Sequence, residues 1–265
     1  MSFLQVQDIH HIYFTKASAT TALSDITLTV EEGEFVSLLG PSGCGKTTLL
    51  SIISSLLKPT QGTVLLENNP VSTSKNQIGY MLQQDYLFPW KTIEENILMG
   101  LKLSRQLNEK NKSAVLNLLY QIGLSGVEKQ LPKQLSGGMR QRAALVRTLA
   151  TEPKLLMLDE PFSALDYQTK LKLEDLISQT LDEFGKTAIL VTHDIGEAIA
   201  MSDRVFLLSP SPGRIYKTFT MPEELRLVSP FEARNHEVFP SIFQAIWKEL
   251  ESLEQGKEKS RTPSF

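Results

Sequence analysis

One short segment of the chain combines glycines, a lysine and a hydroxyl at a spacing that can bind phosphate. Residues 40–47 read GPSGCGKT and match the pattern GxxxxGK(S/T) at every fixed position. The glycines let successive backbone N–H groups turn inward around an anion. Lys46 would reach the outer phosphates of a nucleoside triphosphate, and the Thr47 hydroxyl would bind Mg²⁺. A glycine-rich turn without a ligand is the alternative.

The flanks of this segment favour the nucleotide site. Residues 34–39 (EFVSLL) read as a short buried strand, and residues 47–57 read as a helix that starts inside the glycine loop. A strand, a loop and a helix in this order form the setting that the motif requires. The loop alone does not distinguish kinases, GTPases, helicases and transport ATPases.

Two adjacent carboxylates follow another predicted strand. Residues 154–158 (KLLML) read as a buried strand that delivers Asp159 and Glu160 at its carboxyl end, where open α/β sheets gather ligands. Asp159 can hold Mg²⁺ directly or through water, and Glu160 can accept a proton from the attacking water or orient it. With Lys46 and Thr47, these residues supply the parts for phosphoryl transfer to water.

Further polar residues lie at the ends of predicted strands. A strand over residues 78–84 ends in Gln83 and Gln84, and the strand over residues 188–191 leads to His193. A glutamine amide can ligate Mg²⁺ and orient a water, but it could equally be a surface polar residue. The histidine has a structural alternative, although its position after a buried strand favours a contact with the γ-phosphate.

Three other residues have both a functional and a structural interpretation. Ser136 precedes two glycines and a helix, which suits an anion, but the same pattern is a common helix cap. Tyr13, at the end of a strand, could stack on a flat ring or be a buried or rim tyrosine. Cys44, the single cysteine, lies at a helix N-terminus, so its thiol either has a lowered pKa and can be alkylated, or is an inert loop residue.

Composition bounds the class of protein. The chain has 265 residues, of which 41% are hydrophobic, enough for a proper core, and its formal net charge of -3 gives no general electrostatic case for binding nucleic acid. The N-terminus lacks the basic start and apolar run of a signal peptide. Since no run approaches 18 apolar residues, any membrane-spanning part must come from other chains.

Periodicity suggests how the rest of the chain is organised. Residues 4–30 alternate apolar and polar positions and predict an antiparallel sheet, whereas residues 92–130 show helical spacing and predict an inserted helical segment. Near the C-terminus we expect an amphipathic helix that packs on the core, with a membrane-surface helix as the alternative. Its apolar residues are Val238, Ile242, Ile246, Leu250 and Leu253. The polar tail from Gln255 is expected to be disordered.

These motifs together strongly resemble the nucleotide-binding subunits of ABC transporters, over about residues 4–215. The matching elements are residues 40–47 (Walker A), Gln83 (Q-loop), 135–142 (signature motif, LSGGMRQR), 155–160 (Walker B), 163–166 (D-loop) and His193 (H-loop). The resemblance implies an α/β fold: a P-loop NTPase (RecA-like) core with an N-terminal antiparallel β subdomain and an inserted α-helical subdomain at about residues 90–150. The nucleotide-binding domain would span residues 1–220, and residues 221–265 would form a connector, an amphipathic helix and a polar tail.

The resemblance also assigns roles to single residues, with ATP and Mg²⁺ as the cofactors. Tyr13 looks like the aromatic residue that stacks on adenine, and Glu160 like the residue that polarises the hydrolytic water. The implied catalytic residues are Glu160, His193, Gln83 and Lys46. The implied ATP-binding residues are Tyr13, Gly40, Ser42, Gly43, Cys44, Gly45, Lys46, Thr47, Thr48, Ser136, Gly137, Gly138 and Asp166. The implied metal ligands are Thr47, Gln83 and Asp159.

Two segments resemble a narrower group, the import ATPases of the nitrate, sulfonate and taurine type, which includes thiamine-precursor carriers. They are residues 87–90 (LFPW) and 210–215 (PSPGRI). Residues 54–56 read Ser-Ser-Leu where that group usually has Ala-Gly-Leu, and Leu82 replaces a common Phe. Neither departure touches a phosphate-contacting group, but both leave the transported solute open.

The resemblance implies an ATPase that pairs with a second copy of itself around two ATP molecules. Its other partners would be integral membrane permease subunits and, indirectly, an extracytoplasmic substrate-binding protein, which would place the chain at the cytoplasmic face of the membrane. Tyr86 and Leu87 are expected either to contact the permease or to pack in the core. The alternatives for function are the ATPase of an ABC exporter or lipid-extraction system, and a soluble ABC clamp protein outside transport. Clamp proteins contain either two fused nucleotide domains or a long coiled coil, and this chain shows neither.

Overall fold

The structure is a computed structural model that describes residues 2–16, 18–163, 165–183 and 185–261. Its strands are β1 (Leu4–Phe14), β2 (Ala19–Val30), β3 (Phe35–Leu39), β4 (Gln61–Leu66), β5 (Asn69–Pro70), β6 (Ile78–Met81), β7 (Leu155–Asp159), β8 (Thr187–Thr192), β9 (Arg204–Leu208) and β10 (Ile215–Thr220). Its α-helices are α1 (Lys46–Ile53), α2 (Ile93–Ile97), α3 (Met99–Leu103), α4 (Glu109–Gln121), α5 (Gly137–Leu149), α6 (Tyr167–Glu183), α7 (Ile195–Met201), α8 (Glu223–Arg226), α9 (Pro230–Asn235) and α10 (Phe239–Arg261). Short 3-10 helices lie at Val71–Thr73, Lys75–Gln77 and Pro132–Gln134.

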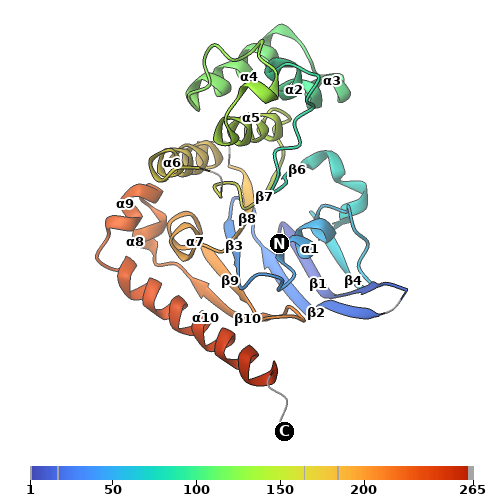
Figure 1. The fold of residues 1–265 in the computed structure, drawn as a ribbon, viewed down its shortest axis with the longest axis vertical. Helices are drawn as coiled ribbons and strands as arrows, with labels where there is room; N and C mark the ends of the chain where they lie inside the picture. The colour runs from blue at the N-terminus through green and yellow to red at the C-terminus, as the bar shows by residue number, and fades with distance from the viewer. Residues whose placement is uncertain (1, 17, 164, 184, 262–265) are drawn as a thin grey trace.

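A mostly parallel sheet forms the centre of the molecule (Figure 1). Its strand order is β10-β9-β3-β8-β7-β6, and only the pairing of β10 with β9 is antiparallel. Strands β3, β7 and β8 are buried at every residue, which explains why their sequences are apolar runs without alternation. Because these three strands run in the same direction, their carboxyl ends meet along one edge of the sheet.

The two faces of this sheet pack against different layers. Side chains on one face, such as Leu38 and Met157, share a core with α1 and the N-terminal sheet. Side chains on the other face, such as Leu156 and Leu190, pack against helices α2 to α6. Successive residues of a strand point to opposite faces, so both layers are built from the same short strands.

Most of the elements expected from the sequence are present. The N-terminal strands β1 and β2 pair antiparallel and join β4 and β5 in a sheet of order β2-β1-β4-β5. The predicted helical insertion contains α2, α3 and α4 and is followed by α5, and these helices gather at the top of Figure 1. The α/β class is therefore confirmed. The division of the chain into residues 1–220 and 221–265 stays a prediction.

Two elements are shorter than predicted. The strand expected over residues 78–84 ends at Met81, because β7, with which it pairs, ends soon after Leu158, the partner of Met81. The helix expected over residues 47–57 ends at Ile53, and Ser55 soon afterwards takes a left-handed φ of 57°, which stops a helix.

The C-terminal helix α10 packs on the core, as predicted, and the segment expected to be a connector contains two further helices, α8 and α9. Ile246 of α10 is fully buried in a cluster with residues of α7, α8 and α9, and Ile242, Leu250 and Leu253 pack against that cluster. The expected disorder from Gln255 is wrong as far as Arg261, because α10 continues to that residue. Regular i to i−4 backbone bonding extends the helix beyond the last packed apolar side chain.

A buried ion pair fixes α9 to the rest of the molecule. Arg234 of α9 lies with Nη1 2.6 Å from Oε2 of Glu174 on α6, and its Nη2 donates to Oε1 at 3.1 Å. The Glu174 side chain is fully buried. Burial raises the pKa of Glu174 to about 7, although the Arg234 charge opposes the increase.

This raised pKa predicts a pH-dependent contribution to stability. Between the ordinary glutamate pKa of 4.5 and about 7, the folded chain binds a proton at Glu174 that the unfolded chain releases. The free energy of unfolding should therefore fall by up to about 3 kcal/mol as pH rises through this window. Urea unfolding from pH 5 to pH 8 measures the slope, which Glu174→Gln should reduce and the exposed-site control Glu251→Gln should preserve. An unchanged slope in Glu174→Gln would show that Glu174 has an ordinary pKa.

Candidate functional site

The glycine loop lies between the end of β3 and the start of α1. Gly45, the N-cap of α1, has a φ of 97°, and a Cβ there would lie 2.6 Å from Cδ2 of Leu23. The buried Lys46 donates from Nζ to the carbonyl oxygens of Gly40 (2.6 Å) and Pro41 (3.1 Å). The loop therefore holds its lysine charge beside the helix N-terminus, an arrangement that suits phosphate.

The cysteine of this loop is not an activated thiol. Cys44 is buried, and burial raises the pKa of its thiol even though the neighbouring Lys46 charge and hydrogen bonds oppose the increase. The interpretation as a reactive cysteine with a lowered pKa is therefore wrong. Removal of the thiol from water raises its pKa by more than the helix N-terminus lowers it. Cys44 contributes to the core beneath the loop.

Asp159 at the end of β7 faces the loop. Its Oδ1 accepts a hydrogen bond from Thr47 Oγ1 at 3.3 Å, and its Oδ2 accepts one from Tyr80 at 3.4 Å. Burial raises the pKa of Asp159, while the hydrogen bond from Thr47 opposes that shift. A hydroxyl and a carboxylate side by side are hard oxygen donors, so these two residues fit Mg²⁺.

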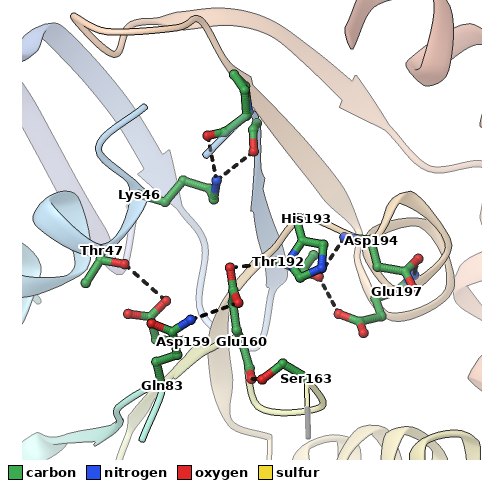
Figure 2. Close-up of polar contacts among 12 residues, drawn as sticks. Lys46, Thr47, Gln83, Asp159, Glu160, Ser163, Thr192, His193, Asp194 and Glu197 are labelled. Atoms are coloured by element: carbon green, nitrogen blue, oxygen red, sulfur yellow. Dashed lines mark hydrogen bonds and ion pairs between the residues drawn. The ribbon is translucent and has the colours of Figure 1, made fainter. Parts of the chain in front are cut away.

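Two other predicted site residues, Gln83 and His193, contact the Glu160 side chain (Figure 2). Gln83 Nε2 donates to Oε2 of Glu160 at 3.1 Å, and His193 Nδ1 lies 3.3 Å from Oε1. The Glu160 backbone adopts a φ of 50°, and its carbonyl accepts from Ser163 Oγ at 3.0 Å and Gln141 Nε2 at 3.3 Å. A carboxylate held in this way can orient a water or accept its proton.

Tyr13 lies beside the start of α1. Its hydroxyl is 3.2 Å from Oγ1 of Thr48, and its ring meets the ring of His11 edge-on at 4.6 Å. The tyrosine is 44% exposed, which excludes the buried alternative and leaves a face that can stack on a ligand ring.

Four predicted ATP-binding residues have no hydrogen bond to the glycine loop within the described part of the chain. Ser136 caps α5 by accepting a hydrogen bond from Met139 N at 3.3 Å, and Gly137 and Gly138 begin that helix. Asp166 accepts from Thr169 N at 3.0 Å, and the hydrogen bonds from Thr169 lower the pKa of Asp166. These groups are positioned by local capping rather than by the loop that binds phosphate.

The sequence did not single out several residues that support the site. Gln141 reaches the Glu160 carbonyl from α5, and Tyr80 reaches Asp159 from β6. Arg140 donates to the Asp85 carboxylate at 2.9 Å, and Arg147 donates to the Asp85 and Tyr86 carbonyls, so the segment after Gln83 is tied to α5. The helical spacing of Arg140 and Arg147, two turns apart on one face, is the signal that could have indicated a shared partner.

Comparison with known proteins identifies the family. A sequence model described as ABC transporter matches residues 23–163. The chain is 60% identical over 255 residues to an uncharacterized ABC transporter ATP-binding protein, YtlC of Bacillus subtilis (strain 168), across 96% of this chain and 98% of that protein. It is 42% identical over 236 residues to the aliphatic sulfonates import ATP-binding protein SsuB of Bacillus licheniformis (89% of each chain). It is 40% identical over 223 residues to the taurine import ATP-binding protein TauB of Pelagibacter ubique (84% of each chain).

Solved structures agree with this result. The fold is similar to the ATP-binding cassette MJ0796 in a dimeric post-hydrolysis state bound to ADP and Pi, with a TM-score of 0.76 and 31% identity, covering 83% of this chain and 99% of that one. The chain therefore belongs to the ABC transporter family. It is an ABC-type ATPase with the P-loop NTPase fold that its motifs resemble.

The glycine loop gives a direct test of the site geometry. Replacing Gly45 by Ala imposes a left-handed backbone on a residue with a Cβ and a contact with Leu23, whereas Gly126, with a φ of 79°, has no atom within 4 Å of an added Cβ. We expect Gly126→Ala to lose about 1 kcal/mol of stability and Gly45→Ala to lose more, with weaker ATP binding in Gly45→Ala alone. Urea unfolding and titration with a fluorescent ATP analogue measure both. Equal effects of the two substitutions would contradict the close packing of the loop.

Proposed function

We propose that this ATPase works as a pair of identical chains that close around two ATP molecules and drive import of a small solute through separate permease subunits. The observation that carries the proposal is the position of Glu160, which contacts Gln83 and His193 beside the Lys46 loop. These groups supply one half of a hydrolytic site. The N-terminus of α5, which has no hydrogen bond to that loop among the described residues, supplies the other half in a second chain.

Each residue of the first half has a task. Lys46 and the loop amides bind the phosphates, and Tyr13 stacks on the adenine, with Thr48 holding its hydroxyl. Glu160 orients the attacking water and takes up its proton as the γ-phosphoryl group passes to water and ADP leaves. His193 is placed to contact the γ-phosphate beside Glu160.

Mg²⁺ would be held by Thr47, Asp159 and the Gln83 side-chain oxygen. Thr47 and Asp159 are already in contact, and Gln83 uses its Nε2 toward Glu160, which leaves Oε1 for a cation. Mg²⁺ is usually bound through few protein ligands together with substrate phosphates, as this set requires. When bound, it would neutralise charge on the phosphates during transfer.

The second half of the site comes from the partner copy. Ser136, Gly137 and Gly138 present backbone donors at the N-terminus of α5, and Asp166 lies in the turn before α6. Two solved cassettes of MJ0796 that are similar to this chain are described as dimeric, one of them with ADP and Pi. A phosphate held between Lys46 of one chain and Ser136 of the other would let bound ATP stabilise the dimer by contacting both chains.

The segment after Gln83 is the proposed contact with the permease. Tyr86 and Trp90 are exposed there, and Phe88 and Trp90 form a tilted ring pair at 5.6 Å. Arg140 and Arg147 tie the segment to α5, so movement at the permease would reach Ser136. Leu87 is buried in the core, and its hypothesised permease contact is therefore wrong, because the side chain already packs among apolar residues.

Import of a small solute is the transport function that the relatives favour, and an anionic or thiamine-precursor-like solute stays our prediction. The similar proteins SsuB and TauB are named as import subunits for aliphatic sulfonates and taurine. No helix in the described residues has the length and apolar character needed to cross a bilayer. We place the chain at the cytoplasmic face of the membrane, bound to permease subunits that an extracytoplasmic substrate-binding protein supplies with solute.

Substitution of Glu160, the proposed general base, should block ATP hydrolysis without preventing ATP-dependent dimer formation. Glu160→Gln keeps a hydrogen-bonding side chain but cannot accept a proton, so turnover should fall at least about a hundredfold while an ATP-bound dimer accumulates. Phosphate release and light scattering with and without ATP measure the two effects, and Glu109→Gln on α4 serves as the exposed control. Wild-type hydrolysis by Glu160→Gln would remove Glu160 from the catalytic role.

A mixing experiment tests whether each site is shared. A Lys46→Ala chain and a Ser136→Arg chain each damage both sites of their own dimer, whereas their mixed dimer retains one site with an intact Lys46 and an intact Ser136. We expect ATP to recover a dimer that contains both chains, detected by capture on a tag carried by only one of them. If ATP recovers no mixed dimer, the shared-site proposal is wrong.

A further inference from the structure

The His193 side chain makes few contacts that could fix the position of its ring. Its side chain is 65% exposed, and within the part of the chain that the structure describes its one polar partner is Glu160, 3.3 Å away. A single contact to a mostly exposed ring does not fix that ring, because the contact is worth little against the loss of side-chain freedom. The position of His193 must therefore come from its backbone neighbours, Thr192 and Asp194.

These neighbours are locked by hydrogen bonds across one turn (Figure 2). Thr192 Oγ1 donates to Glu197 Oε2 and accepts from Asp194 N at 3.0 Å. Asp194 Oδ1 accepts from Glu197 N at 3.2 Å and so caps α7. The turn that carries His193 is consequently closed on both sides, by Thr192 at the end of β8 and by Asp194 at the start of α7.

Lys170 joins the two carboxylates of this turn. Its Nζ lies 2.6 Å from Asp194 Oδ2 and 2.6 Å from Glu197 Oε1, and its side chain is only 15% exposed. Without it, two anions in one partly buried turn would repel each other. Burial disfavours the ammonium, but the hydrogen bonds to Asp194 and Glu197 raise the pKa of Lys170 above its usual value, so the lysine is charged. We call Lys170, Thr192, Asp194 and Glu197 the Lys170 cluster.

The helix that carries Lys170 follows the segment that carries Glu160. Lys170 lies in the first turn of α6, and its backbone N–H donates to the Asp166 carbonyl at 2.9 Å. Earlier in the chain, the Glu160 carbonyl accepts a hydrogen bond from Ser163 Oγ at 3.0 Å. The Lys170 side chain therefore joins the start of α6, the helix that follows the Glu160 segment in the chain, to the turn that carries His193.

We propose that Lys170 is a positioning residue that sets the distance between His193 and the Glu160 carboxylate. It touches no reacting atom: it holds the turn after β8 against the start of α6. The inference rests on the proposed roles of Glu160 and His193. Because small displacements of catalytic groups reduce turnover strongly, the lysine should affect the chemical step more than ATP binding.

The test replaces the ammonium while the full-length protein hydrolyses ATP with Mg²⁺. Lys170→Met should lower kcat at least tenfold with less than a threefold change in KM, and Lys170→Arg, which keeps a cation, should restore most of kcat. Lys172→Met, on an exposed position of the same helix, is the control and should behave as wild type. Thermal unfolding with and without ATP reports whether each variant is folded.

A second variant distinguishes loss of positioning from unfolding. It is needed because Lys170→Met removes the cation that Asp194 and Glu197 share. Lys170→Met/Glu197→Gln removes both charges of one pair, and the amide oxygen that replaces the carboxylate can still accept from Thr192. This variant should be folded and should show the same low kcat. A kcat within twofold of wild type in both variants, a loss confined to KM, or no recovery in Lys170→Arg would overturn the inference. If Glu160→Gln and His193→Ala also keep full turnover, the proposed function fails as well.

Discussion

The parallel pairing of β3, β7 and β8 is the constraint on which the site depends. In the register of these strands, Leu39 lies opposite Thr192, and Asp159 lies opposite Val191. The glycine loop, Glu160 and His193 each follow within a residue of these paired positions, so backbone hydrogen bonds bring three distant segments to one edge. A slip of one residue would turn each side chain to the other face of the sheet and would separate these groups.

The edge formed in this way supplies only part of the ATP site that we propose. Lys46, Thr47 and Asp159 are held together there, and Glu160 is held by Gln83 and His193. The donors at the N-terminus of α5 belong to a different layer, built on helices rather than on strand ends (Figure 1). We infer that hydrolysis is tied to association because neither layer alone surrounds the phosphates.

The sequence predicted the parts of this site that follow buried strands. The loop, Asp159, Glu160 and His193 come directly after apolar runs, and such runs are visible without a structure. The early end of β6 was missed, since its apolar pattern continues beyond the last residue that has a strand partner. The loss of thiol reactivity at Cys44 depends on burial, which a helix N-terminus does not reveal. The contacts of Lys170 with Asp194 and Glu197 join residues of separate elements, and no spacing in the sequence indicates them.

The most direct test of the shared site is the specific ATPase activity of the purified chain as a function of its concentration. The range should include the concentrations at which light scattering shows monomers giving way to ATP-bound dimers. We expect phosphate release per chain to rise with concentration and to level off as the dimer becomes saturated, because one chain holds only half of each site. Equal activity per chain for monomer and dimer would contradict this account.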